Sequence, residues 1–339
     1  MRALSSLVAA AVVAAAAVAG VAAGSSAGTR CALWAAPGGS DASPGTKASP
    51  FLTLGKLAAS LAPGQTGCLP PGAVFTTREV ITGVGNRSGR VTIRTAPGGA
   101  RAVLADGIET TQASRFLTLT DLAISALGDS ATVGVPGTVI VRGYSTFLTR
   151  SDVGPGTLKD VGRSCVVLDH AGSARIEGNV LHECNGDSPG LYSAGVLAST
   201  SAGARIVDNV IYGNVGGDGI ALSPNAQVSR VRFNLIVDNL DGIYFGGDVK
   251  VASRDTLVEQ NVIARTKRYV VHSAYGANHP IGLRNLVRRN CIWSPGAVTA
   301  AGVGFRMGVN RKVNPRVVTS QGTHRLAASS PCRAYSPRP

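Results

Sequence analysis

The segment Arg205-Ile-Val-Asp-Asn209-Val-Ile211 determines the architecture, because close copies of it recur along the chain. The other copies share its apolar residues on both sides of an asparagine: Arg175-Ile-Glu-Gly-Asn179-Val-Leu181, Arg230-Val-Arg-Phe-Asn234-Leu-Ile236, Leu257-Val-Glu-Gln-Asn261-Val-Ile263 and Leu286-Val-Arg-Arg-Asn290-Cys-Ile292. Successive asparagines are 30, 25, 27 and 29 residues apart. Repeats of this length are typical of solenoids, in which stacked units share a core that one unit cannot bury.

Apolar residues occupy two fixed columns beside the asparagine column. One column is Ile176, Ile206, Val231, Val258 and Val287, and the other is Leu181, Ile211, Ile236, Ile263 and Ile292. Short β-branched runs bounded by Asn and Gly predict strands joined by turns with left-handed backbone angles. Neighbouring coils would lie about 4.8 Å apart, so the asparagines are expected to hydrogen-bond to one another along the stack. These features predict an all-β chain folded as a parallel β-helix.

Composition narrows the class of protein further. Of 339 residues, 15% are charged and 5% are aromatic, while glycine occupies 43 positions. So little charge excludes a coiled coil and a disordered acidic chain, and six cysteines are too few for a disulfide-stapled miniprotein. The formal net charge is +14, but basic charge alone is unspecific and no nucleic-acid-binding motif accompanies it. We therefore expect no nucleic-acid partner.

Residues 1–23 are predicted to be a secretory signal peptide. Met1-Arg2 supplies a positive start, an apolar run extends from Leu7 to Ala23, and Val21-Ala-Ala23 offers small residues for cleavage. The alternative, a transmembrane anchor, is disfavoured because the run is short and Ala-rich and no second apolar stretch of about 18 residues follows. The sequence thus predicts a secreted, extracellular protein with no membrane association after cleavage.

The cysteine count agrees with export, because an even number of cysteines in an exported chain argues for disulfides. Six cysteines allow about 15 pairings, and the sequence leaves these open. Pairing in chain order would staple the N-terminal segment, one middle turn and the C-terminal tail. The cysteines are Cys31, Cys68, Cys165, Cys184, Cys291 and Cys332.

Through its Asn-x-Ile turns and the segment Asn239-Leu-Asp-Gly-Ile243, the chain resembles right-handed parallel β-helix proteins of the pectate-lyase-like superfamily. Its start, Cys31-Ala-Leu-Trp-Ala-Ala-Pro-Gly-Gly-Ser-Asp41, is similar to that of secreted β-helix proteins of actinobacterial type. The resemblance implies a capping helix within Phe51 to Leu61. It also implies a cap segment at 24–80, a β-helix at 81–305 and a closing segment at 306–339. With both ends covered, a monomer is expected.

The superfamily contains lyases and hydrolases that act on acidic polysaccharides, and also non-catalytic surface proteins, so the fold leaves the function open. The motifs of pectate lyases and polygalacturonases are absent from this sequence. No adjacent Asp pair stands out for a two-carboxylate hydrolase, which favours a lyase. The first hypothesis is therefore a lyase-like protein that acts by β-elimination on an acidic polysaccharide. The second is a non-catalytic protein that binds a carbohydrate or cell-envelope glycan.

A column of acidic residues is the candidate metal site. Asp218 and Asp241 hold the same position in two Asp-Gly-Ile copies that are 23 residues apart. Asp187 lies in the preceding coil and Asp248 ends the loop after the second copy. Such a stack could bind calcium, which would neutralise the carboxylate of a uronate. The alternative is that Asp-Gly only forms a turn at a corner of the coil.

The best candidate for the reacting groups is a basic loop in the longest coil. From Lys250 to Arg316 the chain has 12 Lys or Arg against two acidic residues. Lys267 or Arg268 is expected to be the base that removes the α-proton, with a nearby His or Tyr as the proton donor. Of the residues near this loop, His272 is predicted to be catalytic, and Tyr244 and Tyr269 are predicted to contact the substrate. The alternative is a solvated basic loop.

Three arginines form a separate column, four residues before each asparagine. They are Arg175, Arg205 and Arg230. If they face outward, their cations suit a polyanionic chain whose charges also repeat. The alternative is a salt-bridge ladder with Glu177 and Glu259.

A last column holds His182, Tyr212 and Trp293, which are expected to be ordinary exposed surface. His170 and His324 are isolated in the sequence and have no predicted partner.

Overall fold

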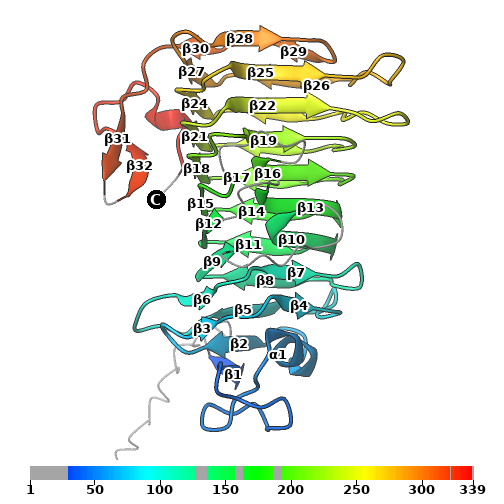
Figure 1. The fold of residues 1–339 in the computed structure, drawn as a ribbon, viewed down its shortest axis with the longest axis vertical. Helices are drawn as coiled ribbons and strands as arrows, with labels where there is room; N and C mark the ends of the chain where they lie inside the picture. Colours follow the sequence, from blue (N-terminus) through cyan, green and yellow to red (C-terminus); the bar gives the residue numbers. More distant parts are fainter. Residues whose placement is uncertain (1–29, 127–135, 157–162, 186–192, 321, 338–339) are drawn as a thin grey trace, which may run out of the picture.

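The computed structural model describes residues 30–126, 136–156, 163–185, 193–320 and 322–337. The chain is a parallel β-helix whose strands form three long sheets of 11, 9 and 10 strands. Figure 1 shows the coils stacked into an elongated solenoid, with β1 near one end and β28 at the other. This architecture confirms the predicted fold.

The 11-stranded sheet contains, in spatial order, β1 (Cys31–Trp34), β2 (Thr66–Leu69), β5 (Val91–Thr95), β8 (Leu117–Thr120), β11 (Phe147–Thr149), β14 (Arg175–Glu177), β17 (Arg205–Val207), β20 (Arg230–Arg232), β23 (Leu257–Glu259), β26 (Asn285–Arg288) and β29 (Phe305–Met307). The nine-stranded sheet contains β4 (Glu79–Ile81), β7 (Ile108–Thr110), β10 (Gly137–Tyr144), β13 (Ser164–Gly172), β16 (Ala194–Ser199), β19 (Asp218–Leu222), β22 (Asp241–Gly246), β25 (Tyr269–Ala274) and β28 (Val298–Ala301). The ten-stranded sheet contains β3 (Val74–Phe75), β6 (Ala102–Leu104), β9 (Leu122–Ala126), β12 (Asp152–Gly156), β15 (Val180–His182), β18 (Val210–Tyr212), β21 (Leu235–Val237), β24 (Val262–Ala264), β27 (Cys291–Trp293) and β30 (Arg311–Lys312).

The two predicted apolar columns form ladders inside the coil. Ile176 pairs with Ile206 and Ile206 with Val231 in the 11-stranded sheet, and all three are buried. Leu181 pairs with Ile211 in the ten-stranded sheet in the same way. Each coil therefore contributes apolar residues to one continuous core, which a single coil could not bury.

The predicted asparagine ladder is confirmed at the turn between the 11-stranded and ten-stranded sheets. The side-chain amide of Asn209 donates to Oδ1 of Asn234 at 2.9 Å, and that of Asn234 donates to Oδ1 of Asn261 at 2.9 Å. Each amide also donates to a backbone carbonyl, as Asn234 does to Ile206 at 2.9 Å. The ladder continues to Asn310 beyond the last predicted member. Every buried amide in it is thus satisfied, which avoids the cost of an unpaired polar group.

Additional elements lie at the N-terminal end and on one side of the solenoid. At the N-terminal end lies α1 (Leu54–Ser60), inside the predicted helical range; the Thr53 hydroxyl caps it by accepting from the Lys56 N–H. The C-terminal hairpin of β31 (Val317–Ser320) and β32 (Thr323–Leu326) packs against the side of the solenoid, where β32 contacts β18 and β21, and η1 (Arg333–Tyr335) follows. Figure 1 shows this hairpin beside the ten-stranded sheet. Paired strands run past the predicted 81–305 at both ends, from β1 to β30.

Three disulfides join the cysteines in chain order: Cys31–Cys68, Cys165–Cys184 and Cys291–Cys332. They hold the first strand to the second, one middle coil to itself and the C-terminal segment to β27. No helix among the described residues is long and apolar enough to cross a membrane.

Candidate functional site

The two aspartates of the predicted acidic column meet in space. Asp218 begins β19, Asp241 begins β22, and the two residues pair in register on the nine-stranded sheet. Asp241 is fully buried and Asp218 is partly buried. Parallel pairing stacks equivalent positions of adjacent coils, so a repeat of 23 residues brings two carboxyl groups together.

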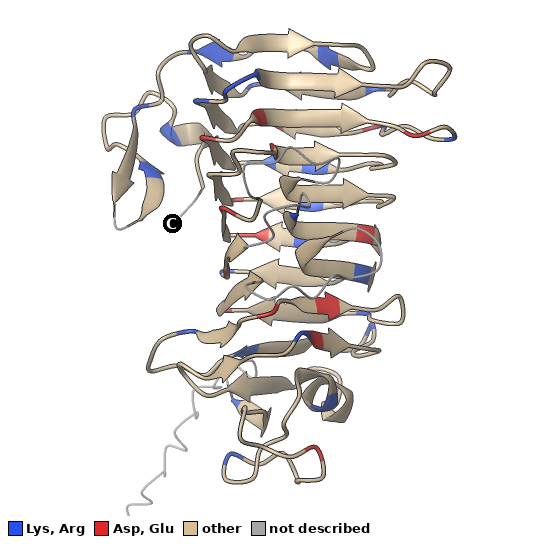
Figure 2. Cartoon of the chain, viewed as in Figure 1, with Lys and Arg blue, Asp and Glu red and all other residues tan. Residues whose placement is uncertain are grey.

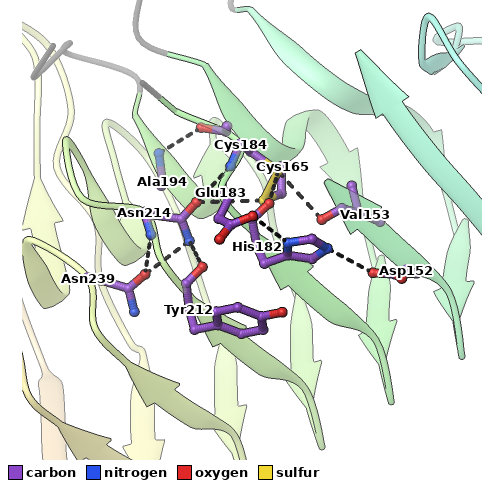
Figure 3. Close-up of a disulfide and its surroundings, with 11 residues drawn as sticks. Asp152, Val153, Cys165, His182, Glu183, Cys184, Ala194, Tyr212, Asn214 and Asn239 are labelled. Carbon is purple, nitrogen blue, oxygen red and sulfur yellow. Dashed lines mark hydrogen bonds and ion pairs between the residues drawn. A yellow bond between two sulfur atoms is a disulfide. The ribbon is translucent and has the colours of Figure 1, made fainter. Parts of the chain in front are cut away.

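A column of polar groups fixes the corner from which these strands begin (Figure 3). The backbone N–H of Cys184, which is disulfide-bonded to Cys165, donates to Oδ1 of Asn214 at 3.2 Å. The side-chain amide of Asn214 donates in turn to Oδ1 of Asn239 at 3.0 Å. Asn214 and Asn239 precede the two aspartates by four and two residues. This second amide ladder was missed in the sequence, although both Asn residues stand before an Asp-Gly-Ile copy.

Asp241 is a buried carboxylate that is surrounded by donors. The Arg268 guanidinium donates to it through Nη2 at 2.5 Å and through Nε at 3.2 Å, and the Tyr269 N–H donates at 2.9 Å. The charge of Asp241 is therefore balanced by one cation, as a buried charge requires. Arg268 stays 53% exposed along its side chain, so it also faces solvent.

His272 lies on β25, one coil beyond Tyr244 and in register with it. Its Nδ1 is 3.5 Å from Oδ2 of Asp241 and makes no hydrogen bond to a described residue. The rings of Tyr244 and Tyr269 lie 4.8 and 4.9 Å from the imidazole, centre to centre. Both predicted sugar-contacting tyrosines therefore pack against this imidazole.

The environment sets the protonation of these groups. Burial, the charge of Asp241 and a hydrogen bond to it raise the pKa of Asp218 well above its ordinary value. Burial lowers the pKa of His272; the Asp241 charge opposes this shift and the Arg268 charge adds to it. The hydrogen bond to Asp241 raises the pKa of Arg268, which stays a cation. The cluster thus combines a carboxyl group of raised pKa, an imidazole of lowered pKa and a paired guanidinium.

The same cluster has the composition of a metal site. One donor atom each from Asp218, Asp241 and His272 lies within 4.8 Å of the others, so the three residues could hold a metal ion. Calcium, however, takes about six to eight oxygen ligands, and this set offers one imidazole nitrogen and only two carboxyl groups. The Arg268 guanidinium, whose Nη2 lies 2.5 Å from Oδ2 of Asp241, already supplies the positive charge that a metal ion would bring. The donor set does not fit calcium.

The remaining predicted site residues lie apart from this cluster or make other contacts. Asp248 accepts from the N–H groups of Lys250 and Val251 at 2.8 Å, so it closes its own turn. Asp187 lies outside the described residues. Lys267 is exposed and its side chain makes no hydrogen bond or ion pair with a described residue. The predicted arginine column lies on β14, β17 and β20 of the 11-stranded sheet.

The predicted charge asymmetry is visible along the solenoid. Figure 2 shows acidic residues spread over the coils from β4 to β22, whereas Lys and Arg prevail on the coils above β22. The cluster of Asp218, Asp241, Arg268 and His272 lies where the two regions meet, because β22 pairs with β25. An anionic ligand at the cluster would therefore lie next to the basic coils.

Comparison with known proteins supports the fold. A family model described as the right handed beta helix region matches residues 156–311. Among solved structures, pectate lyase Pel9A has a TM-score of 0.62 and 12% identity, covering 90% of this chain and 92% of that chain. A structure described as a glycoside hydrolase has a TM-score of 0.60 and 9% identity, with coverages of 82% and 96%. XylC in complex with xylose has a TM-score of 0.57 and 12% identity, with coverages of 84% and 70%.

A search of curated protein sequences gives no match. The protein is a right-handed parallel β-helix protein with pectate-lyase-like neighbours. At such identities the likeness concerns the fold, and the chemistry must be argued from the residues of the cluster.

Proposed function

We propose that the protein is a secreted, lyase-like enzyme that cleaves an acidic polysaccharide by β-elimination at the cluster of Asp218, Asp241, Arg268 and His272. The observation that carries this proposal is that Asp218, Asp241 and His272 each place a donor atom within 4.8 Å of the others, beside the Arg268 guanidinium. Burial raises the pKa of Asp218 and lowers that of His272, which suits an acid and a base. A β-elimination needs these three groups: a proton donor, a base and a cation for the carboxylate of the uronate.

The electrostatics assign one role to each group. The neutral imidazole of His272 takes the α-proton of the uronate, and the resulting electron pair forms the carbon–carbon double bond as the glycosidic C–O bond breaks. Asp218 gives its proton to the leaving oxygen. Arg268 donates to Asp241 through Nε and Nη2, and no described residue accepts from its Nη1, which is left for the uronate carboxylate. Because its pKa is raised, Arg268 acts as the cation here and His272 replaces it as the base.

A two-carboxylate hydrolase is the competing reaction, because the structure does bring two aspartates together. Such enzymes hold their carboxyl groups about 5–5.5 Å apart when retaining and about 6.5–9.5 Å apart when inverting. One carboxyl oxygen of Asp218 lies within 4.8 Å of one of Asp241, which is closer than either of these separations. The spacing therefore favours elimination over hydrolysis.

The second candidate function is that of a non-catalytic protein that binds an anionic carbohydrate or cell-envelope glycan. The outward-facing arginine column supports it, because binding requires regular cations but no acid–base pair. The two candidate functions differ in one requirement: only the lyase needs Asp218 to be protonated and His272 to be neutral.

Secretion and a monomeric state remain part of the proposal. The three disulfides fit an oxidising extracellular compartment, in agreement with the signal peptide predicted at residues 1–23. Calcium has no assigned step, because the cluster carries its own cation in Arg268.

The test uses the purified protein with pectate, alginate, hyaluronan, chondroitin and heparin, each with calcium and with EDTA. The ultraviolet absorbance of unsaturated uronates reports elimination, and a reducing-sugar assay reports any cleavage. We expect absorbance to rise with at least one substrate in EDTA, and His272→Ala to abolish the rise. The control His170→Ala changes an exposed histidine outside the cluster and should retain activity. Reducing sugar without absorbance would establish a hydrolase, and binding without cleavage would support the non-catalytic function.

A further inference from the structure

A second polar surface lies on the 11-stranded sheet, on a different face of the coil from the aspartate cluster. Arg175, Arg205 and Arg230 occupy consecutive coils in strict register, on β14, β17 and β20. They line a hollow of about 330 Å³, with Phe147 beside Arg175 at one end. We call this hollow the arginine groove.

The guanidinium groups of the arginine groove are mostly unneutralised. Arg205 and Arg230 are exposed, and neither has an acidic partner within ion-pair distance among the described residues. Arg175 pairs with Glu177 at 2.5 Å through Nη2, but its buried Nε donates to no described residue. The predicted alternative of a salt-bridge ladder is therefore wrong for two of the three arginines, while Glu259 pairs with Arg232 and Arg288 instead.

The turn beside these arginines keeps the groove open. The residues two positions before each arginine are Ser173, Gly203 and Val228, and all three adopt positive φ angles, of 51°, 71° and 53°. Serine and glycine are small, so two coils leave space next to the guanidinium groups, and the serine adds a hydroxyl that can bind an oxygen. The hollow is therefore a consequence of the turn sequence.

The ends of the groove define its length. Toward the N-terminus the column continues with Phe147, whose ring is covered by the Arg90 guanidinium 3.5 Å from its centre. Toward the C-terminus it continues with Leu257 and Leu286, which carry no charge. The uninterrupted column of arginines thus spans three coils, from β14 to β20.

We propose that the arginine groove binds a linear anionic glycan, which runs along the solenoid axis and places carboxylate or sulfate groups opposite Arg175, Arg205 and Arg230. Arginine is suited to this ligand because its planar fork donates two parallel hydrogen bonds to a carboxylate or sulfate. Coils about 4.8 Å apart repeat on the scale of one sugar unit in an extended chain. The groove therefore fits about three acidic units. This site is independent of any chemistry at Asp218.

The groove favours a glycan over single-stranded nucleic acid. Proteins that bind single strands without sequence preference stack the bases on aromatic side chains. Among the described residues that line the groove, only Phe147 carries an aromatic ring, and Arg90 already lies against its face. Cations without a free stacking surface match a chain of charged sugars.

The test measures binding of fluorescent galacturonate and heparin oligosaccharides by anisotropy, with a labelled single-stranded DNA oligomer of equal charge as the comparison. We expect Arg205→Gln/Arg230→Gln to weaken oligosaccharide binding by about tenfold or more, since each lost charged hydrogen bond is worth at least that much. The control Arg87→Gln/Arg101→Gln removes the same charge from two exposed arginines outside the groove and should bind like the wild type.

Chain length sharpens the test, because affinity should rise up to about three acidic units and then level off. Comparing the affinities of the galacturonate and heparin oligosaccharides shows whether the groove prefers carboxylate or sulfate groups. Equal losses in both double variants would show unspecific charge attraction and overturn the site. Tighter binding of DNA through the same arginines would overturn the choice of a glycan. Unchanged binding in Asp218→Asn would keep the groove separate from the proposed catalytic site.

Discussion

The nine-stranded and the 11-stranded sheets stack their coils in the same way, but the stacked residues carry opposite charges and differ in burial. On the nine-stranded sheet the stacked residues are the acids Asp218 and Asp241, of which Asp241 is fully buried and Asp218 is partly buried. On the 11-stranded sheet they are Arg205 and Arg230, which are exposed and have no acidic partner among the described residues. Burial beside Asp241 raises the pKa of Asp218, so we expect the two residues to form a proton-sharing pair, whereas the exposed arginines keep their charges open to an anionic ligand.

The largest expected effect comes from breaking the proton-sharing pair. Asp218→Asn keeps the shape of the side chain but removes the proton that the leaving oxygen must receive. We expect activity to fall about 100-fold or more, within the range for lost general acid catalysis. Steady-state rates by ultraviolet absorbance measure this loss. Retention of more than half of the activity would show that Asp218 is only a turn residue.

The next effect concerns the scaffold that both sheets share. Asn234 accepts from Asn209 and donates to Asn261 and Ile206, so Asn234→Ala leaves buried groups unpaired on both sides. We expect a loss of about 2–4 kcal/mol in the free energy of unfolding, measured by denaturant titration. Asn310→Ala removes the last, partly exposed member of the ladder and should cost about 1 kcal/mol or less. Equal effects at the two positions would contradict the ladder account.

A smaller effect on stability is expected from pH. It arises where the column of His182 and Tyr212 contacts His324 of the C-terminal hairpin. The Tyr212 ring stacks between His182 and His324, at 5.2 and 4.4 Å, and His324 contacts Asp238 at 2.9 Å. Burial alone would lower the pKa of His182, but the hydrogen bonds to Asp152 and Glu183 and the charges of these two residues together outweigh it, and the pKa is raised. His182 therefore stabilises the folded state fully below its unfolded-state pKa of about 6.5. This stabilisation is lost as the pH rises through the higher pKa of the folded state.

Thermal unfolding between weakly acidic and weakly alkaline pH measures this dependence. We expect the wild type to lose stability as pH rises and His182→Gln to flatten that slope. His170→Ala, at an exposed histidine of the nine-stranded sheet, is the control and should keep the wild-type slope. A slope in the opposite direction would contradict the raised pKa of His182.

The smallest effect is expected where the arginines are exposed. Arg205→Gln/Arg230→Gln removes two unpaired cations from one column, so the free energy of unfolding should change by about 0.5 kcal/mol or less. Denaturant titration at low salt checks this value. A large loss of stability would show that these arginines are structural, in contrast to their proposed role as a binding surface.

Repetition explains how much of this molecule can be read from its sequence. The columns of Ile206 and Ile211 and the asparagine ladder follow from spacing alone, because parallel coils place equivalent residues side by side. Spacing also puts Asp218 beside Asp241. It does not show that burial beside Asp241 raises the pKa of Asp218, so the pair was interpreted as a metal site.

Features that lie outside the repeat were not predictable. Tyr212 was expected at the surface, but the C-terminal hairpin covers it, and its hydroxyl donates to the carbonyl of Gly322, 110 residues later. Burial raises the pKa of Tyr212 to about 12. His324, which had no predicted partner, is the residue that stacks on it. Trp293, on the same column, stays 38% exposed because it lies on β27 beyond these contacts.

The protonation state of Asp218 tests the central claim most directly. Carbon-13 NMR of the side-chain carboxyl groups, followed through a pH titration of wild type and Asp241→Asn, reports this state without any substrate. We predict that Asp218 titrates well above the ordinary value of about 3.9 in the wild type and that its pKa falls in Asp241→Asn. A carboxyl group that titrates at its ordinary value in both proteins would contradict the acid–base site.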